Sequence, residues 1–361
     1  MARGIDADHT RSYVQIGRTS PERDRSSRDR RIKDVDSLAR LFLVVVGVAV
    51  VVLQTATGGS ARPAGGSPVA LVTAESSDEV LAVSLPAGKV LRRVHLVNPQ
   101  AIAAEPSGPA VVVSPSGTVT LLAYHSLRRL KVFRSFRSPQ IAAITPDGKW
   151  AYVTDAATGK LCVINLAERK IVDTVFVGAG AHHLAISPDG DRTWVALSEQ
   201  ATTIVILDTS NPAAPRVVSR FHPSVAAHDL AFAPDGQTVW VSSAAAPYVS
   251  VLDARSARLV ATVSAGKAPQ HIAFIPYGKP RAFVSSGYGS TIEEVDAGTR
   301  RIVARAELPY GSFDLATSGD IVATASLLDG EVSEFNGETL ARWMTRKLAP
   351  ATRDLAISVW P

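Results

Sequence analysis

Cysteine is almost absent from this sequence: Cys162 is the only one among 361 residues. A disulfide within the chain is therefore excluded, and so is the Cys-X-X-Cys-His motif that attaches haem covalently. The neighbours of Cys162, in the segment Leu-Cys-Val-Ile-Asn, are mostly apolar. This environment predicts a buried, unreactive thiol and not a nucleophile.

Several motifs of catalysis and nucleotide binding are also missing. The chain has no P-loop, no dinucleotide-binding fingerprint, no Gly-X-Ser-X-Gly elbow and no His-Glu-X-X-His helix. The net charge is only +5, and much of it comes from the segment 1–40, where ten basic and seven acidic side chains lie. Because the rest of the chain shows no basic stripe, we do not expect nucleic acid as a partner.

Long apolar runs are limited to one, from Leu41 to Leu53. A spanning helix needs about 20 residues, whereas the apolar region of a secretory signal has about 7–15. We predict a disordered, Arg-rich cytoplasmic segment at 1–40, a signal peptide or signal anchor at 41–59 and a linker at 60–66. The excess of basic residues before the apolar run places the N-terminus inside. The remainder would be extracytoplasmic, either anchored to the membrane or secreted after cleavage.

What the sequence does contain is a repeat. The phrases EPSG, TPDG, SPDG, APDG, IPYG and TSGD place a glycine at 108, 148, 190, 236, 278 and 319, so the successive intervals are 40, 42, 46, 42 and 41. Each phrase lies between runs rich in Val, Ile and aromatic residues. A period of roughly 40 residues in a chain of short strands is typical of a β-propeller, with one blade per repeat.

Each repeat predicts four strands, a to d, with the Pro-Asp-Gly turn between a and b. The triplet b-c-d occurs seven times, but the first triplet has no strand a before it and the last strand a has no triplet after it. We therefore predict that residues 67–361 form seven four-stranded blades, in which the C-terminal strand completes the first blade and closes the ring. Strand a is expected at 99–104, 139–144, 181–186, 227–232, 269–274, 312–317 and 353–358.

This unit resembles the YVTN repeat of the YncE-like seven-bladed propellers. The segment Tyr152-Val153-Thr154-Asp155 carries the resemblance, with aromatic-Val pairs at Trp194, Trp240 and Phe283. The resemblance covers residues 67–361 and implies an exported propeller. Similar seven-bladed folds include lactonases and subunits of redox enzymes. We interpret the strand-b aromatic residues as packing between blades.

Polar residues gather where strand a begins, and in a propeller these positions surround one mouth of the central channel. Aligned on the turn, one set is Gln100, Gln140, His182, His228, Gln270, Phe313 and Arg353. The next set is Ala101, Ile141, His183, Asp229, His271, Asp314 and Asp354. Four of the eight histidines fall in these sets. Because side chains alternate along a strand, His182 and His183 are not expected to reach the same point unless the backbone bends there.

From these sets we select nine candidate ligand-binding residues: His182, His183, His228, Asp229, Gln270, His271, Asp314, Arg353 and Asp354. Three interpretations stay open. Imidazoles and carboxylates can bind a divalent metal ion. The same groups can act as acids and bases, with Arg353 attracting an anion. The third is a channel filled only with water.

The leading functional hypothesis is a monomeric binding module that takes a small-molecule or protein ligand at the channel mouth. One alternative is a lactonase-type hydrolase that uses a mouth histidine or aspartate as base and Arg353 as an anion anchor. The other is a redox subunit that depends on a metal or cofactor.

Overall fold

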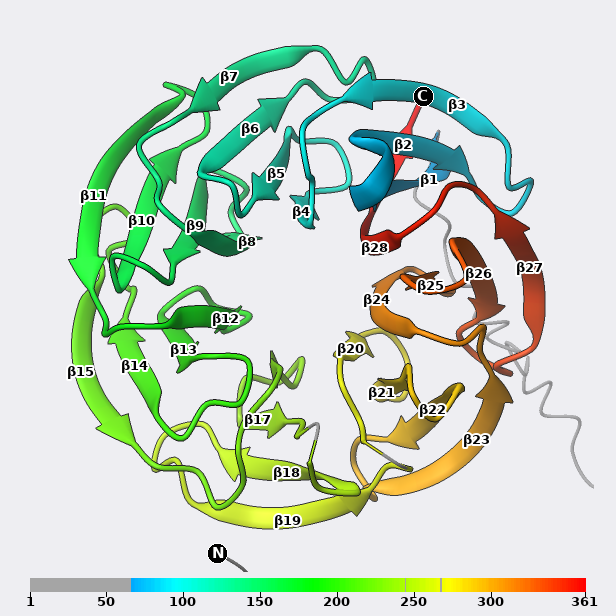
Figure 1. Ribbon diagram of the computed structural model, residues 1–361. Helices are drawn as coiled ribbons and strands as arrows, with labels where there is room; N and C mark the ends of the chain where they lie inside the picture. The colour runs from blue at the N-terminus through cyan, green and yellow to red at the C-terminus, as the bar shows by residue number, and fades with distance from the viewer. Residues whose placement is uncertain (1–65, 244, 267) are drawn as a thin grey trace, which may run out of the picture. The chain divides into compact units, whose positions relative to one another are not determined.

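A computed structural model describes residues 66–243, 245–266 and 268–361. They form seven antiparallel sheets of four strands each, arranged in a ring around a channel (Figure 1). The prediction of a seven-bladed β-propeller is confirmed. Among the described residues no helix is long and apolar enough to cross a membrane. The segments predicted at 1–40 and 41–59 lie outside the described residues.

The blades follow one another in chain order, apart from the first, which also takes the last strand. Blade 1 comprises β28 (Thr352–Trp360), β1 (Ser67–Ala74), β2 (Glu79–Ser84) and β3 (Val90–His95), with a short 3-10 helix, η1 (Glu75–Ser77), after β1. Blade 2 comprises β4 (Ala101–Ala104), β5 (Ala110–Ser114), β6 (Thr118–Leu122) and β7 (Arg129–Phe133). Blade 3 comprises β8 (Pro139–Ile144), β9 (Trp150–Asp155), β10 (Lys160–Asn165) and β11 (Lys170–Phe176). Blade 4 comprises β12 (Ala181–Ile186), β13 (Arg192–Leu197), β14 (Ile204–Asp208) and β15 (Arg216–Phe221).

The remaining blades have the same plan. Blade 5 comprises β16 (Leu230–Phe232), β17 (Thr238–Val241), β18 (Tyr248–Asp253) and β19 (Leu259–Ser264). Blade 6 comprises β20 (Ile272–Ile275), β21 (Arg281–Ser286), β22 (Thr291–Asp296) and β23 (Arg301–Glu307). Blade 7 comprises β24 (Ser312–Ser318), β25 (Ile321–Ser326), β26 (Glu331–Asn336) and β27 (Arg342–Lys347). Strands β16 and β20 begin later than predicted, so that His228 and His271 precede them.

The ring closes in blade 1, as the sequence predicted. Strand β28 pairs antiparallel with β1, from Ser67 opposite Trp360 to Ala74 opposite Thr352. In Figure 1 the C-terminal β28 therefore lies innermost beside β1, at the channel. The joined strands come from the two ends of the propeller sequence, and closure leaves no unpaired blade in the ring.

Large apolar side chains fill the space between neighbouring blades. Trp194 in β13 is fully buried and stacks edge-on against Phe221, 5.2 Å away, and against Phe232 of the next blade, 6.0 Å away. This confirms the packing role predicted for the strand-b aromatic residues. Cys162 is buried as well, and burial raises the pKa of its thiol to about 12. The thiol is thus protonated at neutral pH and unreactive, as predicted.

The repeated turn owes its shape to its last glycine. In the copy at 187–190, the Gly190 N–H donates to the Ser187 carbonyl at 2.8 Å, and Gly190 has φ of 80°. This left-handed conformation is unfavourable for residues with a Cβ atom. The turn sequence therefore determines the local backbone conformation, and each copy of it determines where the following strand b begins.

We expect Gly190→Ala to lower the free energy of unfolding by about 1–2 kcal/mol. Space is not the cause, because an added Cβ would lie 3.6 Å from its nearest neighbour, Pro146 Cδ. Gly298→Ala is the matched control, since its Cβ would meet Asp296 Oδ1 at 3.5 Å but Gly298 is not left-handed. Urea unfolding measures both variants, and equal losses would contradict the conformational explanation.

Candidate functional site

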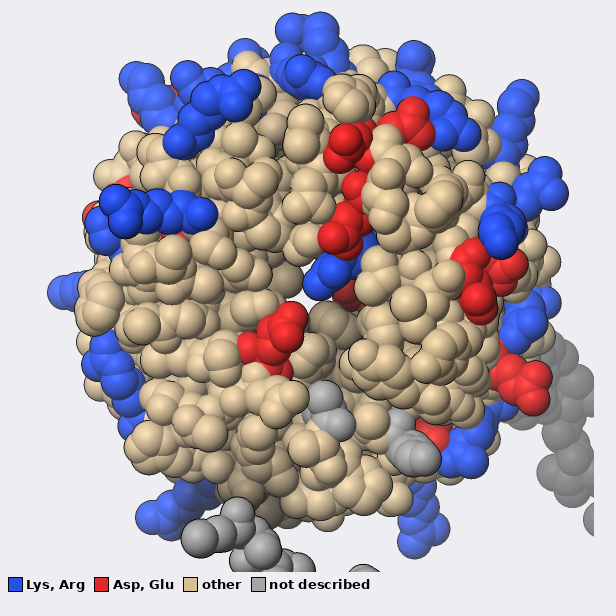
Figure 2. Space-filling model, in the orientation of Figure 1, with Lys and Arg blue, Asp and Glu red and all other residues tan. Residues whose placement is uncertain are grey.

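The site lies at one mouth of the channel, where the innermost strands of the blades begin. A cavity of about 230 Å³ opens there, and a second cavity of about 170 Å³ shares several of its lining residues. Figure 2 shows the opening at the centre of the ring, with acidic and basic side chains beside it. The nine predicted residues all line one cavity or both: Asp229 lines the second only, and His183, His271, Asp314 and Asp354 line both.

Hydroxyl groups near the end of strand b, or just after it, hold the entrance residues in place. The Thr154 hydroxyl donates to the His182 carbonyl of the next blade at 2.7 Å. Ser242 makes the corresponding bond to the Gln270 carbonyl, and Ser285 makes it to Phe313. Each of these bonds joins residues 28 positions apart. The same hydrogen bond therefore recurs between neighbouring blades and holds the residues at the channel mouth in place.

Both adjacent histidines of blade 4 face the mouth, against the expectation from strict alternation. The pairing of β12 with β13 shifts register between Ala181 and Leu184, so the backbone bulges at His182 and His183. Their Nδ1 atoms lie 2.9 Å apart, and both residues line the larger cavity. A β-bulge changes the direction in which a side chain points. The sequence predicted that both histidines could reach the same point only if the backbone bends there, and the bulge is that bend.

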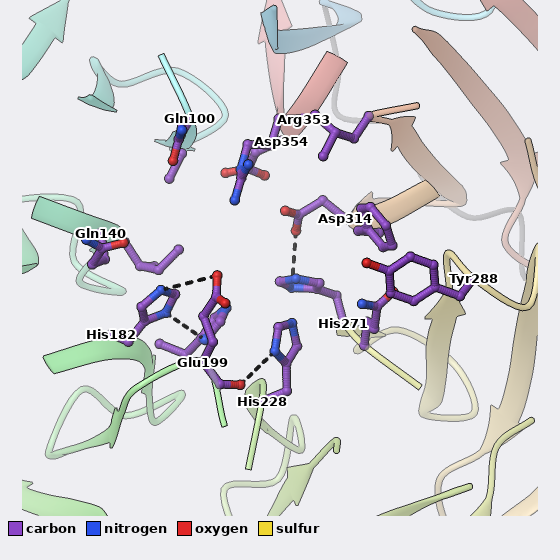
Figure 3. A pocket seen from close by; sticks show the side chains of 16 residues that line it. Gln100, Gln140, His182, Glu199, His228, His271, Tyr288, Asp314, Arg353 and Asp354 are labelled. Atoms are coloured by element: carbon purple, nitrogen blue, oxygen red, sulfur yellow. Dashed lines mark hydrogen bonds and ion pairs between the residues drawn. The ribbon is translucent and has the colours of Figure 1, made fainter. Parts of the chain in front are cut away.

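Three histidines converge closely enough to share one metal ion. One ring nitrogen from each of His183, His228 and His271 lies within 4.8 Å of the others. The ring centroids of His183 and His228 are 4.7 Å apart, and those of His228 and His271 are 5.2 Å apart. The three residues belong to blades 4, 5 and 6, and Figure 3 shows His228 and His271 side by side at the mouth.

The Nδ1 atom of each histidine in this triad has a partner of its own. His228 Nδ1–H donates to the Glu199 carbonyl at 2.9 Å. His271 Nδ1 lies 3.2 Å from Asp314 Oδ1 (Figure 3). His183 Nδ1 faces His182 Nδ1, whose ring in turn has Nε2 at 3.9 Å from Glu199 Oε1.

One set of tautomers satisfies all of these contacts. In it, His183, His228 and His271 each donate from Nδ1, and His182 donates from Nε2 toward Glu199. The Nε2 atoms of the three triad histidines then keep their lone pairs. Metal-binding histidines in proteins are oriented by a carbonyl or carboxylate that accepts from the other ring nitrogen, as for His228 and His271 here, whereas the partner of His183 is another imidazole.

Burial favours the neutral form of His182, His183 and His228. It lowers the pKa of His182 to about 4 and that of His183 well below the ordinary value. The pKa of His228 is also lowered, first by burial and then by the nearby His271. A neutral imidazole is the form that binds metal ions, so these shifts favour coordination at acidic pH.

The carboxyl groups below the histidines are shifted the other way. Burial, with the charge of Asp229, raises the pKa of Asp314 to about 7. Burial and the charge of Asp314 raise the pKa of Asp354 well above its ordinary value. Asp314 is therefore partly protonated near neutral pH, and Asp354 also holds its proton more strongly than an exposed aspartate does.

Three of the predicted residues have structural partners. The Ile272 N–H donates to Asp229 Oδ2 at 3.0 Å, and the Ile102 N–H donates to Asp354 Oδ2 at 2.7 Å, so each aspartate ties its blade to the next. Gln270 accepts from the Gly287 N–H at 3.2 Å and supports the loop after β21.

Sequence reasoning missed Glu75 and Glu199, and it did not single out Tyr288. Glu75 binds Arg353 at 3.1 Å and accepts from Gln100 at 2.7 Å, while Glu199 and Tyr288 line the larger cavity. All three follow the strand b of their blade. Because antiparallel strand b ends beside the start of strand a, these positions could have been predicted from the strand order alone.

No family model and no curated protein matches this chain. Among solved structures, a functionally unknown protein from Desulfotomaculum acetoxidans is 15% identical, with a TM-score of 0.69 over 80% of this chain and 98% of the other. Apo AztD from Citrobacter koseri is 11% identical, with a TM-score of 0.65 over 82% and 98%. NirN, a dihydro-heme d1 dehydrogenase solved with DHE, is 17% identical, with a TM-score of 0.59 over 78% and 64%.

These similarities show the propeller fold alone, because identities from 11% to 17% are too low to carry a function from one propeller to another. The resemblance to YncE-like proteins stays a prediction. Function must be argued from the mouth of the channel.

Proposed function

We propose that this protein is a binding module that holds a divalent transition-metal ion at its channel mouth, with His183, His228 and His271 as the ligands. The observation that carries the proposal is the convergence of three ring nitrogens within 4.8 Å. The oxygen partners of His228 Nδ1 and His271 Nδ1 support it, because they orient these two rings as the histidines of metal sites are oriented.

The donor set fits an ion of intermediate softness. Three imidazoles suit Zn²⁺, Cu²⁺ or Ni²⁺, whereas Mg²⁺ and Ca²⁺ prefer oxygen ligands. A bound ion would act as a Lewis acid with a coordination position open to the cavity. The neighbouring residues of this chain would orient the three imidazoles, and Glu199 would lie at the entrance with its carboxylate beside His182.

The location forms part of the proposal. The apolar run from Leu41 to Leu53 and the excess of basic residues before it support a propeller outside the cytoplasm, tethered by the segment 41–59 or released from it. Metal binding at the mouth is compatible with either state.

A lactonase has less support from the geometry. Its proposed anion anchor, Arg353, is paired with Glu75 at 3.1 Å. One of its proposed bases, Asp229, accepts a backbone hydrogen bond from the next blade. Both residues have partners that account for their presence at the mouth.

We expect the full chain, purified without chelator and dialysed against Zn²⁺, to retain about one ion per chain. His228→Ala and His271→Ala should each weaken Zn²⁺ binding by roughly 100-fold or more, since each removes a ligand. Calorimetric titration and elemental analysis measure the two quantities. His95→Ala is the control, because His95 is exposed on β3 and lies outside the site. Unchanged binding in both mouth variants would overturn the proposal.

A further inference from the structure

Among the outermost strands of the blades, Lys and Arg are more numerous on one side of the ring. The outer strands of blades 6, 7, 1 and 2 are β23, β27, β3 and β7, which we call the basic wall. They carry nine Lys or Arg residues and one acidic residue, and all of these are exposed. The outer strands of the other three blades carry three basic residues and one acidic residue.

Most of this charge is not neutralised. Arg93 pairs with Glu79 at 2.7 Å, and Arg305 pairs with the buried Glu293. The other seven basic residues of the wall have no carboxylate partner within the part of the chain that the structure describes: Arg92, Arg129, Lys131, Arg301, Arg342, Arg346 and Lys347. In Figure 2, Lys and Arg project from the rim of the ring on all sides, and a few acidic residues lie beside the central opening.

The wall also exposes apolar side chains among the charges. Trp343 in β27 is 44% exposed and lies beside Arg342 in the sequence. Val303 in β23 is 57% exposed, and Leu91 in β3 is 43% exposed. Arg and Lys next to an exposed Trp match the chemistry of the membrane interface, where anionic headgroups meet the apolar region.

Protection of sheet edges does not account for this distribution. Outer strands are edge strands, and charges on them prevent pairing with other molecules. That role is served by either sign of charge and is needed on every blade. A single sign, gathered on four consecutive blades, indicates a further purpose.

The point where the chain enters the propeller supports the same conclusion. Strand β1 begins at Ser67, in blade 1, and only residues 60–66 separate it from the predicted apolar segment. Seven residues span about 25 Å at most. An anchor at 41–59 would therefore keep the start of β1 within about 25 Å of the bilayer.

We infer that the basic wall docks on an anionic lipid surface and holds the propeller on its side, so that the channel mouth faces along the membrane. The inference rests on the proposed tether at 41–59 but not on metal binding. The sequence showed no basic stripe because these residues come from strands far apart in the chain, between Arg92 in β3 and Lys347 in β27.

The test places one fluorescent label on the basic wall and one opposite it. Thr345→Cys lies on β27, and Ser219→Cys lies on β15 of blade 4; both positions are exposed. The buried Cys162 will not react with the label. Each full-length variant is reconstituted into vesicles that contain a lipid with a nitroxide headgroup, made either of phosphatidylcholine alone or with phosphatidylglycerol added.

With phosphatidylglycerol present, we expect the label at 345 to be quenched roughly threefold more than the label at 219, and the ratio to fall toward one in about 0.5 M NaCl. Combining Thr345→Cys with Arg92→Glu, Arg346→Glu and Lys347→Glu should also remove the difference. Circular dichroism confirms that this variant is folded. Equal quenching at 345 and 219 in anionic vesicles would overturn the inference.

Two further arms separate other outcomes. If the full chain failed to float with phosphatidylcholine vesicles, the tether would be refuted. In that case, salt-sensitive binding to anionic vesicles that is lost in the triple variant would still support docking by the basic wall. Tight binding to DNA together with equal quenching would assign the wall to a soluble polyanion and overturn the membrane inference.

Discussion

Deletion of residues 353–361 should leave the protein without a stable ring. The deletion removes β28 except for Thr352, and with it the innermost strand of blade 1. Leu355, Ile357 and Trp360 are all buried, and each such side chain contributes about 1.5–3 kcal/mol by burial alone. Their sum is comparable to the whole stability of a typical domain, about 5–15 kcal/mol. Strand β1 would also be left with an open edge, which favours aggregation.

Thermal melting and soluble yield measure this effect. Deletion of Pro361 alone is the control, since that residue is exposed and follows the strand. Leu355→Ala gives an intermediate case, with an expected loss of about 2–5 kcal/mol. A truncated chain that melted within a few degrees of the intact protein would show that closure by β28 is not needed for stability.

Zn²⁺ should stabilise the folded protein strongly and should do so at unusually low pH. An ion that binds only the folded state at a thousandfold excess over its Kd adds about 4 kcal/mol, which corresponds to a rise of roughly 6 °C in Tm for a propeller of this size. Protons compete with the metal for imidazoles. Because burial lowers the pKa of His183 and His228, the rise in Tm should decline less towards about pH 5.5 than it would at a site made only of ordinary histidines, which are mostly protonated there.

In the metal-free protein, the buried histidines and Asp314 should change the folding stability in opposite directions as the pH falls. A histidine with a lowered folded pKa binds fewer protons when folded than when unfolded, so stability is lost as the pH falls from about 6.5 toward the lowered value, about 4 for His182. Asp314, with its pKa raised to about 7, contributes the reverse and adds stability as the pH falls below 7.

Melting curves from about pH 7.5 to 4.5, with and without Zn²⁺, separate these effects. His228→Ala should show a much smaller shift with Zn²⁺ than the unmodified protein, because its Zn²⁺ binding is weakened. His95→Ala should follow the unmodified protein. Disappearance of the Zn²⁺ effect already at about pH 6.5 would mean that the mouth histidines titrate like exposed ones.

The sequence was enough to predict which residues line the candidate site, but not how they are arranged in it. All nine residues selected from the aligned strand entrances line the channel. Their roles differ, however, because each role depends on a partner from elsewhere. Asp229 and Asp354 bind backbone of the next blade, at separations of 43 and 252 residues. Glu199, which orients His228 through its carbonyl, lies on a loop that the alignment of strand entrances did not include.

The number of blades, the turn before each strand b and the closure by the C-terminal strand could all be read from the residues alone. Each of these follows from local chemistry that repeats along the chain, such as the left-handed glycine at Gly190. The convergence of His183, His228 and His271, and the separate acceptors of their Nδ1 atoms, became visible only in the folded ring. The bulge in β12 and the alignment of neighbouring blades around the channel depend on packing across the closed ring, which no single repeat contains.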